Sequence, residues 1–201
     1  MSDGCEPIEL ASYSFLGPQA ADDPIRVGVF AGIHGDEVAG PMAAVRLLQL
    51  LVREPELARG YELSCYPVCN PSGFEDGTRH SRRGHDLNRE FWRESIEPEV
   101  VMLEEQLRKR SFHGIISLHS DDTSDGVYGF VRGAMLTRHL VRPALESMAQ
   151  VLPLNEAPVI DGFAARRGMI REAYEGILSA PAVQRPKPFE VILETPHTAP
   201  V

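Results

Sequence analysis

The sequence lacks the features of a disulfide-bonded secreted domain and of a membrane protein. Its 201 residues contain three cysteines, an odd number that leaves at least one thiol without an intramolecular partner. No apolar run approaches the roughly 20 residues that a membrane-spanning helix needs. Residues 1–6 contain no positively charged segment followed by an apolar stretch, so no signal peptide is expected.

The spacing of the cysteines excludes the usual pairings. Cys65 and Cys69 are four residues apart in a segment that is expected to be extended, which separates them by about 13 Å at ~3.3 Å per residue. That separation is too long for a disulfide. The C-x-x-C spacing of a cysteine zinc site is also absent. We therefore expect Cys5, Cys65 and Cys69 to be free thiols in a cytoplasmic protein.

Positive charge is also scarce. The chain has 20 Lys and Arg residues against 29 Asp and Glu residues, a net charge of -9. This balance argues against nucleic acid or an anionic membrane as a partner. The hydrophobic share of 43% is typical of a globular domain, and a chain of this length forms a sizeable core. We expect one domain, residues 1–201.

Short apolar runs alternate with helical segments along the chain. This alternation predicts an α/β fold, a mixed, mostly parallel β-sheet flanked by helices. The expected strands are 8–15, 25–33, 61–68, 114–118, 127–131 and 189–193, and the expected helices are 41–52, 95–110 and 136–152, the last interrupted or restarted at Pro143. Residues 70–89 are expected to form a long loop, and 155–184 carry no clear pattern.

The first candidate site follows the run of residues 27–31, VGVFA. Such a fully apolar run is typical of a buried strand in a parallel sheet. His34 and Glu37 then fall in a glycine-containing connection to the next helix, where α/β sheets bind ligands. An imidazole and a carboxylate three residues apart can bind one cation, and zinc accepts both kinds of ligand. The pair alone is weak evidence, since H-x-x-E also occurs by chance.

Two further strands end in groups capable of chemistry. His119 follows the run GIISL, and Glu194 follows the run FEVIL. Either could be an ordinary strand-end residue. Together with His34 and Glu37, however, His119 would complete a two-histidine, one-carboxylate set with a fourth zinc position left for water. Glu194 is then the candidate general base.

Residues 79–93 concentrate five arginines and two histidines in an acidic protein. One interpretation is a solvated charged loop. The other is an anion pocket, because arginine forks bind carboxylates in a bidentate manner.

Several short motifs, in order, resemble the zinc carboxypeptidase superfamily. They are His34-x-x-Glu37, the N-P-x-G of residues 70–73, Arg79, the G-x-D-x-N-R-x-F of residues 84–91, the SLHS of residues 117–120, and a last strand ending in Glu194. The related succinylglutamate desuccinylase and aspartoacylase group has the same skeleton. The resemblance implies the phosphorylase/hydrolase-like α/β fold of these enzymes.

The resemblance also implies roles for individual residues. His34, Glu37 and His119 would bind one Zn²⁺ per chain, and Glu194 would activate water. Arg79 would stabilise the oxyanion, Asn88 and Arg89 would hold the free carboxylate of the substrate, and Asp86 would hydrogen-bond a ligand histidine and fix its tautomer. Tyr174 is close to the place where carboxypeptidases have a mobile active-site tyrosine, although a half-buried packing tyrosine is the competing interpretation.

We therefore expect a zinc hydrolase that cleaves an amide bond next to a free carboxylate, in a small peptide or an N-acyl amino acid. Carboxypeptidase action is the first choice and deacylation of an N-acyl amino acid the second. A non-catalytic zinc-binding module is the rival from another class. These enzymes usually continue into a further helix after the catalytic glutamate, whereas this sequence stops seven residues after Glu194. A compact member of the superfamily or a shortened chain would both account for that.

Overall fold

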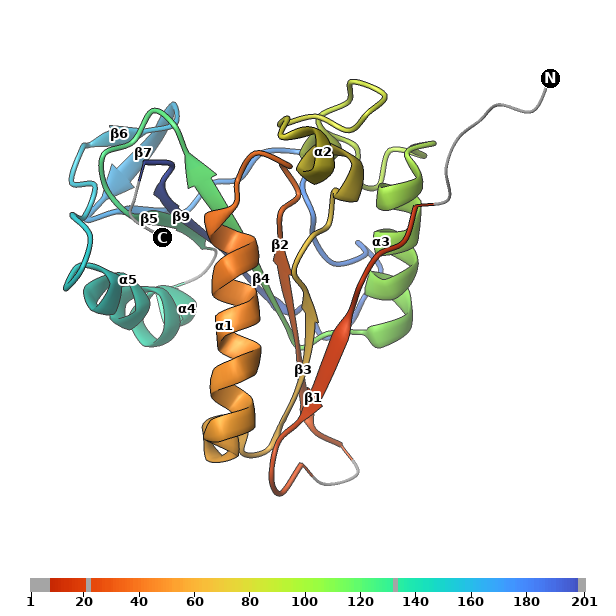
Figure 1. Cartoon of the computed structure of the whole chain (residues 1–201). Helices are drawn as coiled ribbons and strands as arrows, with labels where there is room; N and C mark the ends of the chain where they lie inside the picture. The colour runs from red at the N-terminus through yellow and green to blue at the C-terminus, as the bar shows by residue number, and fades with distance from the viewer. Residues whose placement is uncertain (1–7, 21–22, 132–133, 199–201) are drawn as a thin grey trace.

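A computed structural model describes residues 8–20, 23–131 and 134–198 and shows one mixed sheet with helices on both faces (Figure 1). The nine strands lie in the order β1-β3-β2-β4-β9-β5-β8-β7-β6. Neighbouring strands are parallel from β3 through β2 and β4 to β9, while β1 and β5 are antiparallel to their neighbours at either side of this centre. The predicted α/β fold is confirmed. The strands are β1 (Tyr13–Leu16), β2 (Ile25–Ala31), β3 (Tyr61–Tyr66), β4 (Gly114–Asp121), β5 (Tyr128–Val131), β6 (Val159–Ile160), β7 (Phe163–Arg166), β8 (Met169–Ile170) and β9 (Phe189–Pro196).

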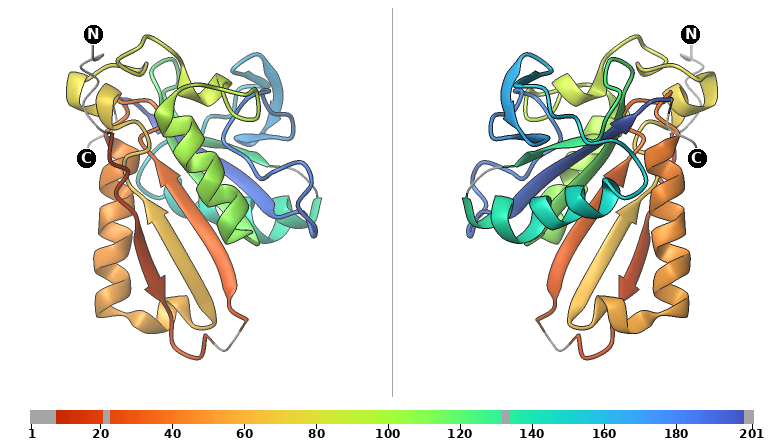
Figure 2. Two further views of the ribbon diagram at one scale, coloured as in Figure 1. Left: turned by 90° about the vertical axis from the view of Figure 1, so that its right-hand side faces the viewer. Right: turned by 90° about the vertical axis from the view of Figure 1, so that its left-hand side faces the viewer.

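The helices divide between the two faces of the sheet. The longest, α1, lies on one face and α3 on the other (Figures 1 and 2). Leu118 packs in the core under α1, and its register partner Leu193 packs in the core with α5 residues, so α1 and α5 cover the same face. The helical elements are α1 (Ala39–Arg53), η1 (Pro55–Ala58), α2 (Pro71–Asp76), η2 (Leu87–Arg89), α3 (Pro98–Arg110), α4 (Ala134–Leu136), the π-helix η3 (Thr137–Val141) and α5 (Arg142–Met148).

Side chains alternate between the two faces along each strand, as the pleat requires. On the α3 face, Phe30 of β2 stacks on Tyr66 of β3 with ring centroids 4.7 Å apart, and both pack against Leu103 and Leu107. On the α1 face, Val29 and its neighbours form a separate core. The central strands are therefore buried on both sides, which is why residues 27–31 of β2 are all apolar.

Two expected boundaries were wrong. Residues 70–89 are not one loop, because α2 and η2 lie within them. Asn70 starts α2: its Oδ1 accepts a hydrogen bond of 2.9 Å from the Gly73 amide, and Pro71 occupies the first helical position. Strands β4 and β9 also run further than expected, so His119 and Glu194 lie inside them.

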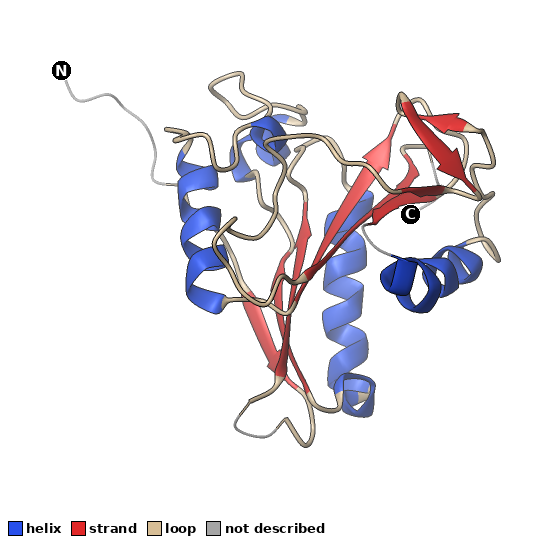
Figure 3. Ribbon diagram, turned by 180° about the vertical axis from the view of Figure 1, so that it is seen from behind, coloured by secondary structure: helices blue, strands red, loops and turns tan. Residues whose placement is uncertain are grey.

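The remaining segments differ in smaller ways. The predicted helix of 136–152 is composed of α4, η3 and α5, and α5 restarts with Pro143 as its second residue. Residues 155–184 contain the short strands β6, β7 and β8, whose two to four residues are too few to show a sequence period. The chain between β8 and β9 has no regular secondary structure (Figure 3).

Cys65 and Cys69 are free and buried, as predicted, and Cys5 lies outside the described residues. His113 is half-buried, and its Nδ1 accepts a hydrogen bond of 3.0 Å from the Arg26 amide. Within the part of the chain that the structure describes, no helix is long and apolar enough to cross a membrane.

Candidate active site

The connection from β2 to α1 is held against α2 by backbone packing. A side chain at Gly35 would bring its Cβ to 2.0 Å from the Gly73 carbonyl carbon, and one at Gly73 would reach 2.5 Å from the His80 carbonyl oxygen. Only glycine fits at either position. The Gly35 amide also donates to the Arg79 carbonyl at 3.4 Å. The two glycine-containing motifs are thus one packing unit, and this unit places His34 and Glu37.

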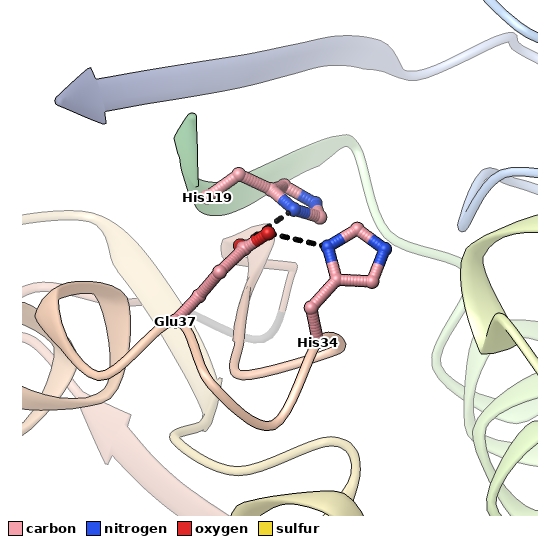
Figure 4. A group of neighbouring side chains, drawn as sticks. All are labelled: His34, Glu37 and His119. Carbon is pink, nitrogen blue, oxygen red and sulfur yellow. Dashed lines mark hydrogen bonds and ion pairs between the residues drawn. The ribbon is translucent and has the colours of Figure 1, made fainter. Parts of the chain in front are cut away.

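Three candidate metal ligands come together beside this unit, at the carboxyl end of the central strands. His34, Glu37 and His119 are each about 3% exposed, and one possible ligand atom from each lies within 4.8 Å of the others. Nδ1 of His34 lies 2.5 Å from Glu37 Oε1, and Nδ1 of His119 lies 3.0 Å from Glu37 Oε2 (Figure 4). Ligand atoms around a tetrahedral zinc are roughly 3.3 Å apart, so the group is compact enough for one ion.

The hydrogen bonds on the far sides of the two rings also suit a metal. Nε2 of His34 lies 3.1 Å from Asp86 Oδ1, an acceptor, so this nitrogen carries the hydrogen of the neutral ring. Nδ1 is then the nitrogen that faces the Glu37 carboxylate, and a metal ion held there would take Nδ1 and a carboxylate oxygen as ligands. Nε2 of His119 similarly lies 3.0 Å from Ser117 Oγ. The donor set therefore fits a divalent ion that prefers nitrogen and oxygen ligands.

The ionisable groups of the cluster shift one another's pKa values. Burial lowers the pKa of His34, but its hydrogen bonds to Asp86 and Glu37 outweigh that effect and leave the pKa above the ordinary value. Burial raises the pKa of Glu37, yet the charges and hydrogen bonds of His119 and His34 bring it well below the ordinary value. Glu37 is therefore ionised at neutral pH, the state in which a carboxylate binds a metal.

Glu194 of β9 lies next to the cluster. It is the register partner of His119 on β4 and of Tyr128 on β5, so the three side chains emerge on the same face of the sheet. Loss of solvation raises the pKa of Glu194 to about 8; the charge of His119 opposes this increase, and those of Glu37 and Asp121 add to it. A bound dication would lower this pKa toward neutrality. Within the described part of the chain Glu194 has no ion-pair partner, and it lines the same cavity as the three candidate ligands.

Arg79 and Asp86 connect the charged loop to the cluster. Nη1 of Arg79 lies 3.5 Å from Glu37 Oε1, and Nη2 lies 3.2 Å from Asp86 Oδ2. Asp86 also accepts from the Asn88 amide at 3.0 Å and so begins η2. The pKa of Asp86 is well below its ordinary value, because contacts with His34 and Arg79 outweigh its burial.

The three residues expected to contact substrate share a cavity with the cluster. Asn88, Arg89 and Tyr174 line a cavity of about 210 Å³ together with His34, Glu37, Arg79, His119 and Glu194. The Arg89 guanidinium stacks over the Tyr174 ring at 4.3 Å, and the Tyr174 hydroxyl donates to the Asp161 carbonyl at 2.9 Å. Oδ1 of Asn88 already accepts from the Leu178 amide at 3.0 Å, which leaves its NH₂ group for a ligand.

The structure adds residues that the sequence did not single out. Tyr128 lines the cavity, and its hydroxyl donates to Asp121 Oδ2 at 2.8 Å. Asp161 lies opposite, in a turn with a positive φ of 52°. Tyr128 lies in a predicted strand, and the alternation of side chains along that strand could have placed it on the cavity face. Asp161 lies in the unassigned 155–184 segment and offered no such signal.

Glu97, at the start of α3, fixes the loop that carries Arg79 and Asp86. Its side chain is 1% exposed, and Oε2 accepts a hydrogen bond of 2.8 Å from Ser81 Oγ, while Oε1 lies 3.2 Å from His85 Nδ1. Ser81 and His85 close a tight turn through an amide-to-carbonyl bond of 2.9 Å. Arg79 and Asp86 flank this turn. A buried carboxylate therefore anchors the two residues that contact Glu37 and His34.

Removing this anchor has a defined expected effect. Glu97→Ala leaves the buried Ser81 hydroxyl without its acceptor, so we expect a loss of about 1–3 kcal/mol in the free energy of unfolding. Turnover should fall as well, because Arg79 and Asp86 lose their support. Denaturant unfolding and steady-state kinetics measure both effects. Glu105→Ala, on the exposed face of α3, is the control, and equal effects from the two variants would contradict the assignment.

Comparisons with known proteins agree with this geometry. The family model of the succinylglutamate desuccinylase/aspartoacylase catalytic domain matches residues 24–155, more than half of the chain. A search of curated proteins gave no match. A structure from Shewanella denitrificans described as a metallopeptidase is 25% identical, with a TM-score of 0.78, and the match covers 96% of this chain and 72% of that one.

Two further solved structures have the same fold. A metallopeptidase structure from Shewanella amazonensis is 25% identical, with a TM-score of 0.79 and coverage of 95% of this chain and 75% of that one. An aspartoacylase family protein from Mesorhizobium loti is 18% identical, with a TM-score of 0.62 and coverage of 96% and 57%, which shows the fold alone. The family match and the fold together confirm the resemblance to the zinc carboxypeptidase-like superfamily. The chain belongs to the succinylglutamate desuccinylase/aspartoacylase catalytic domain family.

Proposed function

We propose that this protein is a zinc-dependent hydrolase that removes the acyl group from an N-acyl amino acid by cleaving the amide bond next to a free carboxylate. The observation that carries the proposal is the content of one small cavity. It brings together the three candidate ligands, the candidate base Glu194, and two arginines, Arg79 and Arg89. Metal ligands, a base and anion-binding groups are the parts that this reaction requires.

His34, Glu37 and His119 would hold the zinc. When bound, the metal would polarise the substrate carbonyl and lower the pKa of water toward 7. Glu194 would accept the proton of the attacking water and pass it to the leaving nitrogen as the C–N bond breaks. Arg79 would donate hydrogen bonds to the oxyanion that develops on the carbonyl oxygen.

Arg89 and the free NH₂ group of Asn88 would hold the substrate carboxylate. The stacking on Tyr174 holds the Arg89 guanidinium in place, and pre-organisation of this kind reduces the entropy lost on binding. Tyr174 would thus orient the anchor and border the substrate. Its hydroxyl is tied to the Asp161 carbonyl, which supports a positioning role over a mobile one.

The family match supports deacylation. Carboxypeptidase action on a peptide C-terminus is the second candidate, and one observation favours it. A larger, mostly apolar cavity of about 620 Å³ adjoins the first and shares Phe130, Tyr174, Ile177 and Ile192 with it. Such a cavity has room for the side chain of a C-terminal residue.

A product screen tests the proposal. The zinc-loaded protein is incubated with N-acetyl and N-succinyl amino acids and with short peptides, and products are identified by mass spectrometry. We expect free amino acids from the N-acyl substrates. Release of C-terminal residues alone would favour the second candidate, and no product from either class would favour a non-catalytic zinc-binding module.

The carboxylate anchor can be tested separately. Arg89→Ala should weaken transition-state binding of a free-carboxylate substrate by about 2–5 kcal/mol, the range for truncating one partner of a buried charge pair. The amidated analogue lacks the charge, so it should lose little more. Zinc content should not change. Arg82→Ala removes an exposed arginine of the same loop as a control, and an equal loss on both substrates would make Arg89 structural.

A further inference from the structure

Four arginines line a second cavity that shares no lining residue with the candidate active site. The cavity has a volume of about 600 Å³ and lies at the β7–β8 hairpin and the start of α5. Figure 1 shows β7 and α5 on the side of the molecule away from α3. The arginines are Arg142, Arg166, Arg167 and Arg171, and one carboxylate, Glu172, joins them.

The four cavity arginines carry unpaired charges in an acidic protein. The chain has a net charge of -9, and several other exposed arginines form ion pairs, as Arg59 does with Glu56 and Arg108 with Glu104. Among the described residues, none of the four cavity arginine side chains has a hydrogen-bond or ion-pair partner. Four arginines therefore line one cavity with a single carboxylate beside them, which leaves their guanidinium groups available to an anion.

The backbone at Arg167 gives a second, independent observation. Arg167 and Gly168 form the two-residue connection between β7 and β8, with φ values of 52° and 68°. A turn of this kind favours Asn-Gly, since both residues adopt the left-handed conformation. A side chain such as arginine is strained there. Arg167 therefore lines the cavity from a position where asparagine would fold more easily.

We propose that this cavity binds a small polyvalent oxyanion through the guanidinium groups of the four arginines. Arginine forks match the oxygen atoms of phosphates and carboxylates, which are the two groups that could supply this charge. The volume falls within the range of about 300–1,000 Å³ that is common for small-molecule sites. The acidic protein as a whole repels nucleic acid and anionic membranes, so a small ligand fits best.

Calorimetric titration of the zinc-loaded protein with inorganic phosphate, and separately with tricarballylate, tests the proposal at constant ionic strength. We expect saturable binding of at least one probe, and the two arms tell phosphate from polycarboxylate recognition. The double substitution Arg166→Gln with Arg171→Gln should weaken that binding at least about tenfold, because charge-assisted hydrogen bonds are lost. Arg89→Ala removes the carboxylate anchor of the candidate active site, and saturable binding of the probe should persist in this variant, which separates this cavity from the candidate active site.

A matched control removes the same charge elsewhere. Arg46→Gln with Arg53→Gln acts on two exposed arginines of α1 and should leave binding within about twofold of the wild type. Equal weakening in both double variants would mean that only net charge matters and would overturn the proposal. Absence of saturable binding of either probe to the wild type would do the same.

Arg167→Asn distinguishes loss of the binding site from loss of the fold. It relieves the strained turn, so we expect the midpoint of thermal unfolding to rise by about 2–4 °C while anion binding weakens. A variant that is more stable yet binds less well supports a site that includes Arg167. Unchanged binding would remove Arg167 from the site, and lower stability would contradict the strain at this position.

Discussion

Glu194→Gln is expected to lose at least about a thousandfold in turnover while it keeps its zinc and its fold. The side chain lies next to the candidate ligands, and a general base typically contributes about 10²–10⁴-fold. Glutamine is close in shape, so β9 should pack as before, but its amide cannot accept the proton of the attacking water. Steady-state kinetics with zinc analysis and binding of a substrate-like inhibitor measure the three properties together.

Glu194→Gln should also change how the stability of the metal-free protein depends on pH. In the metal-free protein the Glu194 pKa is raised from 4.5 to about 8, so the folded state holds this proton more tightly than the unfolded chain does. Its contribution to stability is therefore present at low pH and is lost as the pH rises from about 4.5 through about 8. The metal-free variant should lose less stability over this range than the wild type.

Zinc loss in Glu194→Gln would instead make Glu194 a ligand, and near-normal turnover would place the base elsewhere.

His119→Ala is expected to lose most of the bound zinc and, with it, the activity. Two ligands remain, but both lie in the connection between β2 and α1, and the ligand from β4 is gone. Zinc at 100 times its dissociation constant stabilises a protein by about 2.7 kcal/mol, so added zinc should stabilise the wild type and not the variant. Elemental analysis and thermal unfolding with and without zinc measure both effects.

The control removes an imidazole from another place. His139 is exposed on η3 and outside the candidate cavity, so His139→Ala should keep the zinc and the stabilisation. Full retention of zinc by His119→Ala would remove His119 from the ligand set.

The parts of the site that could be predicted from the sequence are those carried by the buried strands. Short apolar runs bounded by turn residues indicate buried strands, and parallel strands present their carboxyl ends at one edge of the sheet. His34, His119 and Glu194 follow or end such runs, and for this reason their meeting could be foreseen. The exact strand ends could not, since polar residues such as His119 and Glu194 continue the ladder.

Other parts of the site depend on contacts that leave little trace in the sequence. Tyr174 contacts Arg89, which lies 85 residues earlier in the sequence. The segment that contains Tyr174 is held by single hydrogen bonds and two-residue strands. Glu97 appears in the sequence as an ordinary acidic residue before a helix, and only the folded loop shows that it is buried. The arginine cavity likewise joins the β7–β8 hairpin to α5, which no local pattern connects.

Titration of the metal-free protein with zinc, with hydrolysis of an N-acyl amino acid as the readout, tests the central proposal most directly. The chelated protein should be inactive, and activity should rise with added zinc and level off at about one ion per chain, the number that a single two-histidine, one-carboxylate cluster holds. Hydrolysis that persists at full rate after complete removal of metal would contradict the proposal.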